Sequence, residues 1–209
     1  MIPTDSIFTF IIASFVLINS PGPDLIFVVT QSAIHGVRTG ILITLGLVSG
    51  LVFHTLLVAF GVAAIIIASP VAFTVLKTIG ALYLLYLAWQ AFSAHSNKLT
   101  AEKNIPKTAF QLYRRGIFMN ITNPKVTVFF LAFLPQFVTT NSDQSALYQI
   151  FELSAIFMLL GLSSFITIAF TAGKLGNWLN QSDKAQLYLN RIAGFVFTAL
   201  AVNLLLSSI

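Results

Sequence analysis

The sequence has no cysteine and few charged residues. Without a thiol, a disulfide framework, a cysteine-ligated metal site and a thiol nucleophile are all excluded. Only 8% of the residues are charged and 57% are hydrophobic, whereas a soluble domain carries roughly 25% charged residues. The apolar residues come in long blocks rather than in the alternation of a membrane β-barrel. The composition therefore predicts an all-α integral membrane protein.

Other absences exclude further classes. The first residues, 1–6, contain no Lys or Arg, so we expect a retained first helix rather than a signal peptide. No Gly-x-x-x-x-Gly-Lys-Ser/Thr loop is present, which argues against ATP-driven pumping by this chain. The few His and acidic residues do not form a metal site, and no cofactor is expected. We interpret the net charge of +5 as a topology signal rather than a nucleic-acid-binding surface.

The apolar blocks divide the chain into transmembrane segments. A spanning helix needs about 20 mostly apolar residues, and proline ends a helix; Ser69-Pro70 therefore separates two spans. The polar and basic segment 95–112 is read as a loop, and the polar stretches 139–145 and 173–190 are read as links between spans. We predict one transmembrane domain, 1–209, with spans at 5–33, 39–68, 71–94, 113–138, 147–172 and 192–206.

The positions of the cations predict the orientation. The connections after the first, third and fifth spans carry most of them, and the positive-inside rule places these connections in the cytoplasm. Both termini are then expected on the periplasmic side of a bacterial inner membrane. The cations in these connections are Arg38, Lys98, Lys103, Lys107, Arg114, Arg115, Lys174, Lys184 and Arg191.

Two proline-containing breaks interrupt the first and fourth spans. Asn19-x-x-x-Pro23-Asp24 matches Asn120-x-x-x-Pro124-Lys125, and each is followed by an apolar run. Because three spans separate them, the halves of about 1–94 and 113–209 would enter the membrane from opposite sides. This arrangement predicts a 3+3 inverted repeat, which is common among secondary transporters.

The breaks supply a candidate site. In hydrocarbon, irregular backbone survives only against protein or a water-filled cavity. Asp24 and Lys125 each cost about 2.5–3.5 kcal/mol at a helix centre, so they are expected to face the interior and each other. A zwitterionic amino acid could separate them, or they could form a permanent ion pair that joins the two halves. The substrate-binding candidates are Asn19, Pro21, Gly22, Pro23, Asp24, Asn120, Asn123, Pro124 and Lys125.

A few other polar residues lie within apolar segments. His54 shares a helix face with Gly46 and Gly50, so it is expected to point toward a partner helix or a cavity. It could relay protons together with Asp24, or it could form a neutral hydrogen bond to a neighbouring helix. Tyr83 and Tyr86 are interpreted as packing residues.

Four stretches together resemble the LysE/RhtB family of bacterial amino-acid exporters. They are Pro21-Gly22-Pro23-Asp24, the glycines Gly36, Gly40, Gly46 and Gly50, the stretch from Lys77 to Leu87, and Asn120-x-Thr122-Asn123-Pro124-Lys125. Ala88 departs from the glycine expected after the third stretch. The resemblance covers most of the chain and maps the family's motif positions onto Pro21, Gly22, Pro23, Asn123, Pro124 and Lys125.

The resemblance implies a secondary exporter of small amino acids or derivatives such as homoserine, homoserine lactone, threonine or leucine, driven by protons. An exporter or passive facilitator of another small solute is the alternative. An intramembrane enzyme is a remote alternative, since Ser49 near His54 lacks any motif context. The expected partners are the amino-acid substrate, protons and the bilayer, and the sequence is compatible with a homo-oligomer.

Overall fold

The computed structural model describes residues 2–62, 70–94, 108–139, 144–181 and 183–206. In these ranges the chain is helical and contains no strand. The first half contains α1 (Thr4–Asn19), α2 (Pro23–His35), α3 (Val37–Leu57), the π-helical turn η1 (Val58–Val62) and α5 (Pro70–Ser93). The second half contains α6 (Ala109–Ile121), α7 (Pro124–Val128), the π-helical η2 (Phe129–Phe133), the 3-10 turn η3 (Leu134–Phe137), α8 (Ala146–Gln181) and α9 (Asp183–Leu206).

The predicted breaks are confirmed. α1 and α2 meet at an angle of 56°, and α6 and the segment Pro124–Phe137 meet at 51°. Among the described residues, three helices are long and apolar enough to cross a membrane, and each bent pair passes as one further span, which makes five candidates. α5 is another helix of 24 residues. The count of six spans stays a prediction.

Three segment boundaries differ from the sequence prediction. α8 continues for 36 residues to Gln181, and α9 starts at Asp183, so most of the expected polar link 173–190 is helical. Hydropathy marks the limits of the bilayer and not of the helix, because polar residues such as Lys and Gln favour helix where it emerges into water. α6 starts at Ala109 rather than near Tyr113, since Thr108 and Gln111 form a capping box.

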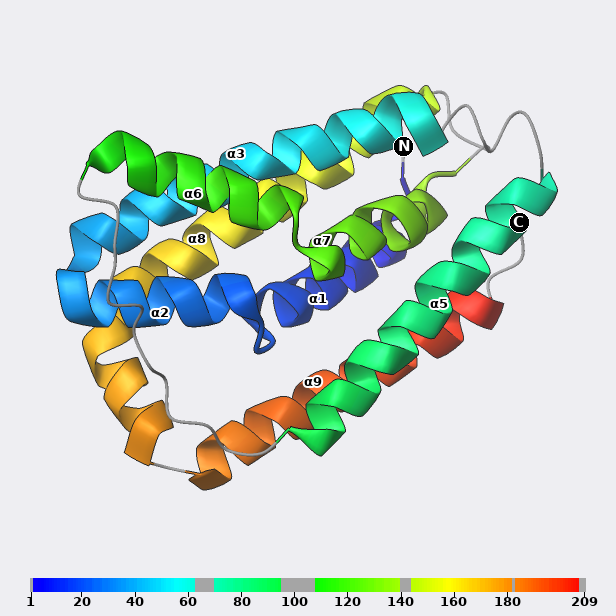
Figure 1. Ribbon diagram of the computed structural model, residues 1–209. Helices are drawn as coiled ribbons and strands as arrows, with labels where there is room; N and C mark the ends of the chain where they lie inside the picture. The colour runs from blue at the N-terminus through cyan, green and yellow to red at the C-terminus, as the bar shows by residue number, and fades with distance from the viewer. Residues whose placement is uncertain (1, 63–69, 95–107, 140–143, 182, 207–209) are drawn as a thin grey trace.

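One group of helices consists of α2, α3, α6 and α8, and the other is the pair α5–α9, with α1 and α7 between the two groups (Figure 1). α3 packs along α6 and α8, and α2 packs against α8. On the other side α5 and α9 lie side by side, and they contact the broken helices through α7, η2 and α1. This arrangement places both breaks in the interior of the molecule.

Small residues bring α3 and α6 into close contact. A side chain at Gly46 would collide with the Tyr113 carbonyl, and one at Gly116 would collide with the Ile43 carbonyl. Helix association in a bilayer depends on such close packing, because lipid tails are as apolar as leucine. Gly36 does not pack in this way: it has a φ of 87° at the junction of α2 and α3, and a side chain there would meet nothing within 4 Å.

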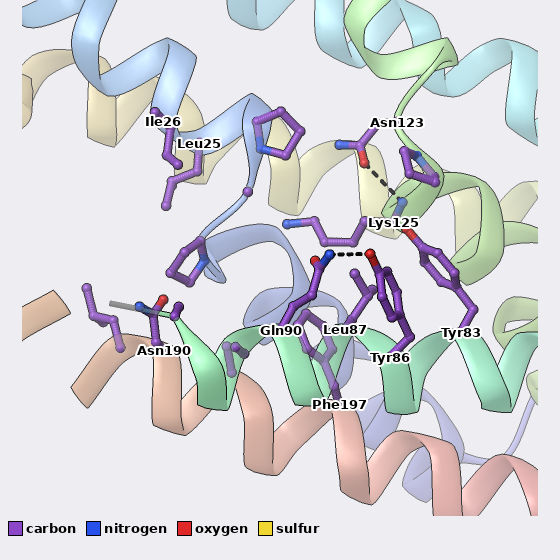
Figure 2. A pocket seen from close by; sticks show the side chains of 18 of the residues that line it. Leu25, Ile26, Tyr83, Tyr86, Leu87, Gln90, Asn123, Lys125, Asn190 and Phe197 are labelled. Atoms are coloured by element: carbon purple, nitrogen blue, oxygen red, sulfur yellow. Dashed lines mark hydrogen bonds between the residues drawn. The ribbon is translucent and has the colours of Figure 1, made fainter. Parts of the chain in front are cut away.

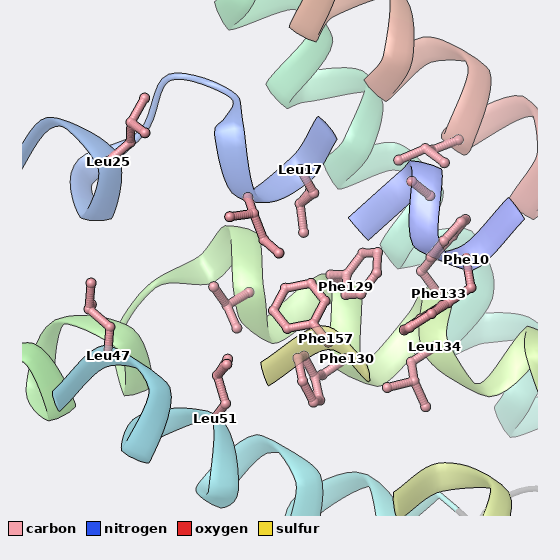
Figure 3. Packing of buried hydrophobic residues seen from close by; sticks show 14 of the residues in the cluster. Phe10, Leu17, Leu25, Leu47, Leu51, Phe129, Phe130, Phe133, Leu134 and Phe157 are labelled. Carbon is pink, nitrogen blue, oxygen red and sulfur yellow. The ribbon is translucent and has the colours of Figure 1, made fainter. Parts of the chain in front are cut away.

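A cluster of phenylalanines fills the space between α1, η2 and α8 (Figure 3). Phe129 is central, with ring-centroid distances of 5.8 Å to Phe10 and 5.0 Å to Phe157. Phe130 lies 5.2 Å from Phe157, and both rings are buried. We refer to Phe10, Phe129, Phe130, Phe133, Phe137 and Phe157 as the phenylalanine cluster. It closes the part of the interior that lies beyond the breaks, toward the start of α1 and the start of α8.

Candidate functional site

The first break exposes the carboxyl end of α1. Pro21 has no N–H, so the Leu17 carbonyl four residues earlier loses its helical donor. Ser20 partly compensates, since its hydroxyl donates to Leu17 O at 2.7 Å and its N–H donates to Val16 O at 2.8 Å. Gly22 is extended, with φ of −177°, and Pro23 starts α2. The break therefore gathers carbonyl oxygens with incomplete backbone partners.

The second break is closed by its own residues and by α3. Pro124 deprives the Asn120 carbonyl of its helical donor. That oxygen accepts instead from Asn123 N–H at 3.0 Å and from His54 Nε2 at 3.2 Å. Because a carbonyl only accepts, His54 must carry a proton on Nε2. Asn123 caps α7, its Oδ1 accepting from Lys125 N–H at 3.0 Å.

Lys125 connects the two breaks. Its ammonium donates to Leu17 O at 3.0 Å, to Ser20 O at 3.2 Å and to Ser20 Oγ at 3.2 Å. Positive charge at the carboxyl end of α1 is favoured by the helix dipole. Gly22 makes room for it, since a Cβ there would lie 2.9 Å from Lys125 Nζ. The second break thus supplies the donor that the first break lacks.

Asp24 lies beside this contact but does not share it. It sits in the first turn of α2 and is 4% exposed. Its electrostatic neighbours are Lys125, Asn123, Asn120 and His54. The hydrogen bonds of Lys125 go to α1 rather than to Asp24, and Asp24 Oδ1 has no hydrogen-bond partner among the described residues. The two opposite charges are therefore close without forming the direct ion pair considered from the sequence.

A cavity of about 760 Å³ lies between the breaks and the α5–α9 pair. Figure 2 shows Lys125 on the side of the breaks, with Tyr83, Tyr86 and Gln90 of α5 facing it. The cavity reaches Ala94 at the end of α5 and Gln186 near the start of α9. Six of the predicted site residues line it: Pro21, Gly22, Pro23, Asn123, Pro124 and Lys125.

The remaining predicted residues lie elsewhere. Asp24 and Asn120 line a second, much smaller cavity, which Lys125 also borders. His54 is buried and forms a hydrogen bond with the Asn120 carbonyl of α6, so it points toward a partner helix as expected from the sequence. Asn19 donates to Phe15 O at 2.7 Å and to Ser164 Oγ of α8 at 3.3 Å, and it lines neither of these two cavities.

Sequence reasoning missed the wall that α5 contributes. Tyr86 was interpreted as packing, but it is 47% exposed and lines the cavity together with Tyr83 and Gln90. These residues are three and seven positions apart, which puts them on one helix face. The spacing was therefore visible in the sequence. What was missing was the knowledge that this face meets the breaks rather than lipid.

The arrangement offers no metal or redox chemistry of its own among the described residues. No group of three or more His, Asp or Glu residues is close enough to hold an ion in that part of the chain. The site instead combines one buried cation, a cavity of about 760 Å³ and two broken helices, which are features of a solute pathway.

Comparison with known proteins decides the class. Residues 15–208 match the family model described as LysE type translocator. The chain belongs to this family. It is a multi-pass membrane translocator of bacterial type and not an enzyme.

Relatives of this translocator cover nearly its full length. The homoserine/homoserine lactone efflux protein of Salmonella typhimurium is 32% identical over 96% of this chain and 95% of its own length. The leucine efflux protein of an Enterobacter species is 28% identical over 94% of this chain and 93% of its own length. An uncharacterized membrane protein of Bacillus subtilis is 28% identical over 95% of this chain and 97% of its own length. No solved structure matches the chain.

Proposed function

We propose that this translocator exports small amino acids or their derivatives from the cytoplasm and that the 760 Å³ cavity receives the substrate. The named relatives support this, since they are efflux proteins for homoserine, homoserine lactone and leucine. The candidate substrates are these compounds and threonine. Protons are proposed to drive the export.

The observation that carries the proposal is the position of Lys125. Its ammonium borders the large cavity and holds backbone carbonyls of the other half of the chain. A carboxylate is a stronger partner for an ammonium than a peptide carbonyl, because both groups are then charged. A substrate that binds Lys125 from the cavity therefore weakens the bridge between α1 and α7.

Helix polarity favours the same ligand group. α2 is a helix of 13 residues that begins at Pro23 in the cavity wall. The positive end of its dipole faces the place where the substrate carboxylate would lie. Broken helices whose ends face the substrate are a recurring feature of secondary transporters.

The packing of the helices supports the inverted repeat. Exchanging the halves maps α1–α2 onto α6–α7, α3 onto α8, and α5 onto α9. The pairs α5–α9 and α3–α8 map onto themselves, and both are in contact. The contact of α3 with α6 maps onto the contact of α8 with α1, which is also present.

The cavity has the access that an exporter needs for loading. α3 and α6 begin, and α8 ends, at the opposite end of the molecule from the start of α1 and the end of α9 (Figure 1). Arg38, Arg114 and Lys174, which the positive-inside rule assigns to the cytoplasm, belong to those ends, so we propose that these ends face the cytoplasm. The cavity runs from the breaks to Ala94 and Gln186, on the same side, while the phenylalanine cluster closes the other. This conformation is therefore assigned to the inward-facing state.

Asp24 is proposed as the group that carries the proton. Its carboxyl group is near enough to Lys125 for the two charges to interact, and it lines the small cavity and not the large one. Lys125 lines both cavities, so a substrate that draws Lys125 away from α1 also changes the surroundings of Asp24 in the small cavity. Proton release from Asp24 can then be coupled to substrate movement, which a passive facilitator would not require.

Two substitutions test this function. Lys125→Gln removes the cation and Asp24→Asn removes the titratable carboxyl, and each is expected to abolish efflux of preloaded homoserine, threonine or leucine from proteoliposomes with an imposed proton gradient. Lys184→Gln, at an exposed cation near the start of α9, is the matched control and should export at the wild-type rate. The amount of each variant in the membrane is measured alongside.

The outcomes separate the alternatives. Normal export by both variants would sink the proposed site. Export by the wild type at a rate independent of the proton gradient would identify a facilitator. No flux of any amino acid with the wild-type protein would overturn the export function itself.

A further inference from the structure

The side of the cavity formed by α5 is polar but uncharged. Tyr83, Tyr86 and Gln90 face the breaks from one helix face (Figure 2). Gln90 Nε2 donates to the Tyr86 hydroxyl, and the rings of Tyr83 and Tyr86 are 5.9 Å apart. We refer to Tyr83, Tyr86 and Gln90 as the α5 wall. It presents an amide oxygen, phenol oxygens and aromatic faces opposite Lys125.

The cavity carries one sign of charge. Of the described residues that line it, only Lys125 has a charged side chain. Asp24, the acid expected to meet the substrate's ammonium, lines the small cavity and not the large one. A zwitterion that places its carboxylate at Lys125 in this state therefore has no carboxylate available among those residues for its ammonium.

The α5 wall supplies the groups that can take this role. An ammonium is bound by amide and phenol oxygens as hydrogen-bond acceptors and by the faces of aromatic rings. With its Nε2 donating to Tyr86, the Gln90 amide keeps its carbonyl oxygen as an acceptor. The wall lies across the cavity from Lys125, where the opposite end of a small zwitterion would lie.

We propose that the α5 wall is the ammonium subsite of the exporter and that it restricts the substrates to those with a single positive charge. The inference rests on the proposed export function and narrows its substrate class. A second ammonium or guanidinium, as in lysine or arginine, would lose its hydration without gaining a partner of opposite charge. It would also be repelled by Lys125. Neutral amino acids and their uncharged-side-chain derivatives bind, and basic amino acids are rejected.

The first test uses the wild-type protein. Proteoliposomes loaded with unlabelled leucine, homoserine or threonine are assayed for exchange with the same labelled amino acid outside, and lysine and arginine are added as competitors. The neutral amino acids should exchange, and a hundredfold excess of lysine or arginine should leave that exchange unchanged. Exchange or competition by lysine as effective as by leucine would overturn the inference while leaving amino-acid export intact. If no amino acid exchanges, the proposed function fails instead.

The second test examines the subsite itself. Gln90→Leu removes the amide acceptor and should weaken competition by leucine about tenfold, since a hydrogen bond to a charged group is lost. Competition by 4-methylpentanoate, which is leucine without its amino group, should be unaffected by the substitution. Equal weakening of both compounds would show that Gln90 acts on the shape of the cavity and not on the ammonium.

A gain-of-function variant completes the design. Asn190 is a buried cavity residue on α9, away from Lys125 in Figure 2. Asn190→Asp keeps the side-chain shape and adds the missing negative charge, so lysine and arginine should become competitors; Asn190→Leu, the uncharged control, should not admit them. If the Asp variant is folded, as judged by its thermal unfolding, and still rejects both basic amino acids, the charge argument is wrong.

Discussion

Lys125 and His54 show how single side chains repair a broken helix. Each donates to a carbonyl that a proline four residues later has deprived of its partner: Lys125 to Leu17 O and His54 to Asn120 O. An unsatisfied backbone group in hydrocarbon costs several kcal/mol. The two prolines are therefore tolerated because a side chain from another helix reaches each break.

The hydrogen bond of His54 leads to a prediction. His54→Gln keeps a donor near Asn120 O and should retain both exchange and gradient-driven export. His54→Leu leaves that carbonyl with Asn123 N–H alone and should lower the unfolding free energy by about 1–3 kcal/mol, measured by thermal unfolding in detergent. If the Gln variant exchanges normally but loses gradient-driven export, His54 belongs to the proton path.

The partner of Lys125 was not predictable from the pattern of side chains. A buried lysine and a buried aspartate at matching positions indicated a pair, and both are indeed buried in the interior. The acceptors that Lys125 uses are backbone oxygens, which any sequence carries and which become available only where proline has interrupted the ladder. The position of the site could be predicted, whereas its hydrogen bonds could not.

At the scale of helices, proline placement predicted the breaks well and hydropathy predicted the helix ends less well. Pro23 and Pro124 each start a new helix, because proline fits the first turn, where its missing N–H is not needed. The extension of α8 to Gln181 was missed because polar residues that favour helix look like a loop in a hydropathy profile. The π-helical segments η1 and η2 had no sequence signal that we identified.

The contact of α3 with α6 gives a stability prediction. Gly116→Ala introduces a Cβ against the Ile43 carbonyl and should lower the unfolding free energy by about 1–3 kcal/mol. Gly161→Ala, on α8, is the matched control: its Cβ would meet nothing within 4 Å, and alanine favours helix by about 1 kcal/mol. Thermal unfolding midpoints of the two variants in the same detergent compare them. Equal shifts would show that the close approach of α3 and α6 does not limit stability.

At the scale of the whole molecule, the arrangement of the cations makes the orientation testable. The chain has no cysteine, so a single introduced thiol is the only labelling site. Ser145→Cys, just before α8, should react with a membrane-impermeant maleimide in intact spheroplasts. Lys184→Cys, near the start of α9, should react only after the membrane is permeabilised. The reverse pattern would invert the proposed topology and reassign the cavity to the outward-facing state.

The composition was enough to predict a membrane protein, but it could not predict the cavity. A charged fraction of 8% indicates that lipid rather than water surrounds the helices. It does not determine which face of α5 meets the breaks, because a face with Tyr83 and Tyr86 suits lipid contact and cavity contact equally. That choice depends on the packing of α5 against α9, which brings together parts of the chain about a hundred residues apart.

The bridge from Lys125 to α1 has a consequence for when the exporter works. The Lys125 ammonium is already bound to acceptors within the chain, the carbonyl oxygens of Leu17 and Ser20. A substrate that must displace these acceptors binds more weakly than it would to a free ammonium. Under the proposed mechanism, ordinary cytoplasmic levels of an amino acid leave the bridge closed, and only an excess opens it. The break in the first helix would then set a threshold concentration for export, below which the cytoplasmic amino acid is retained.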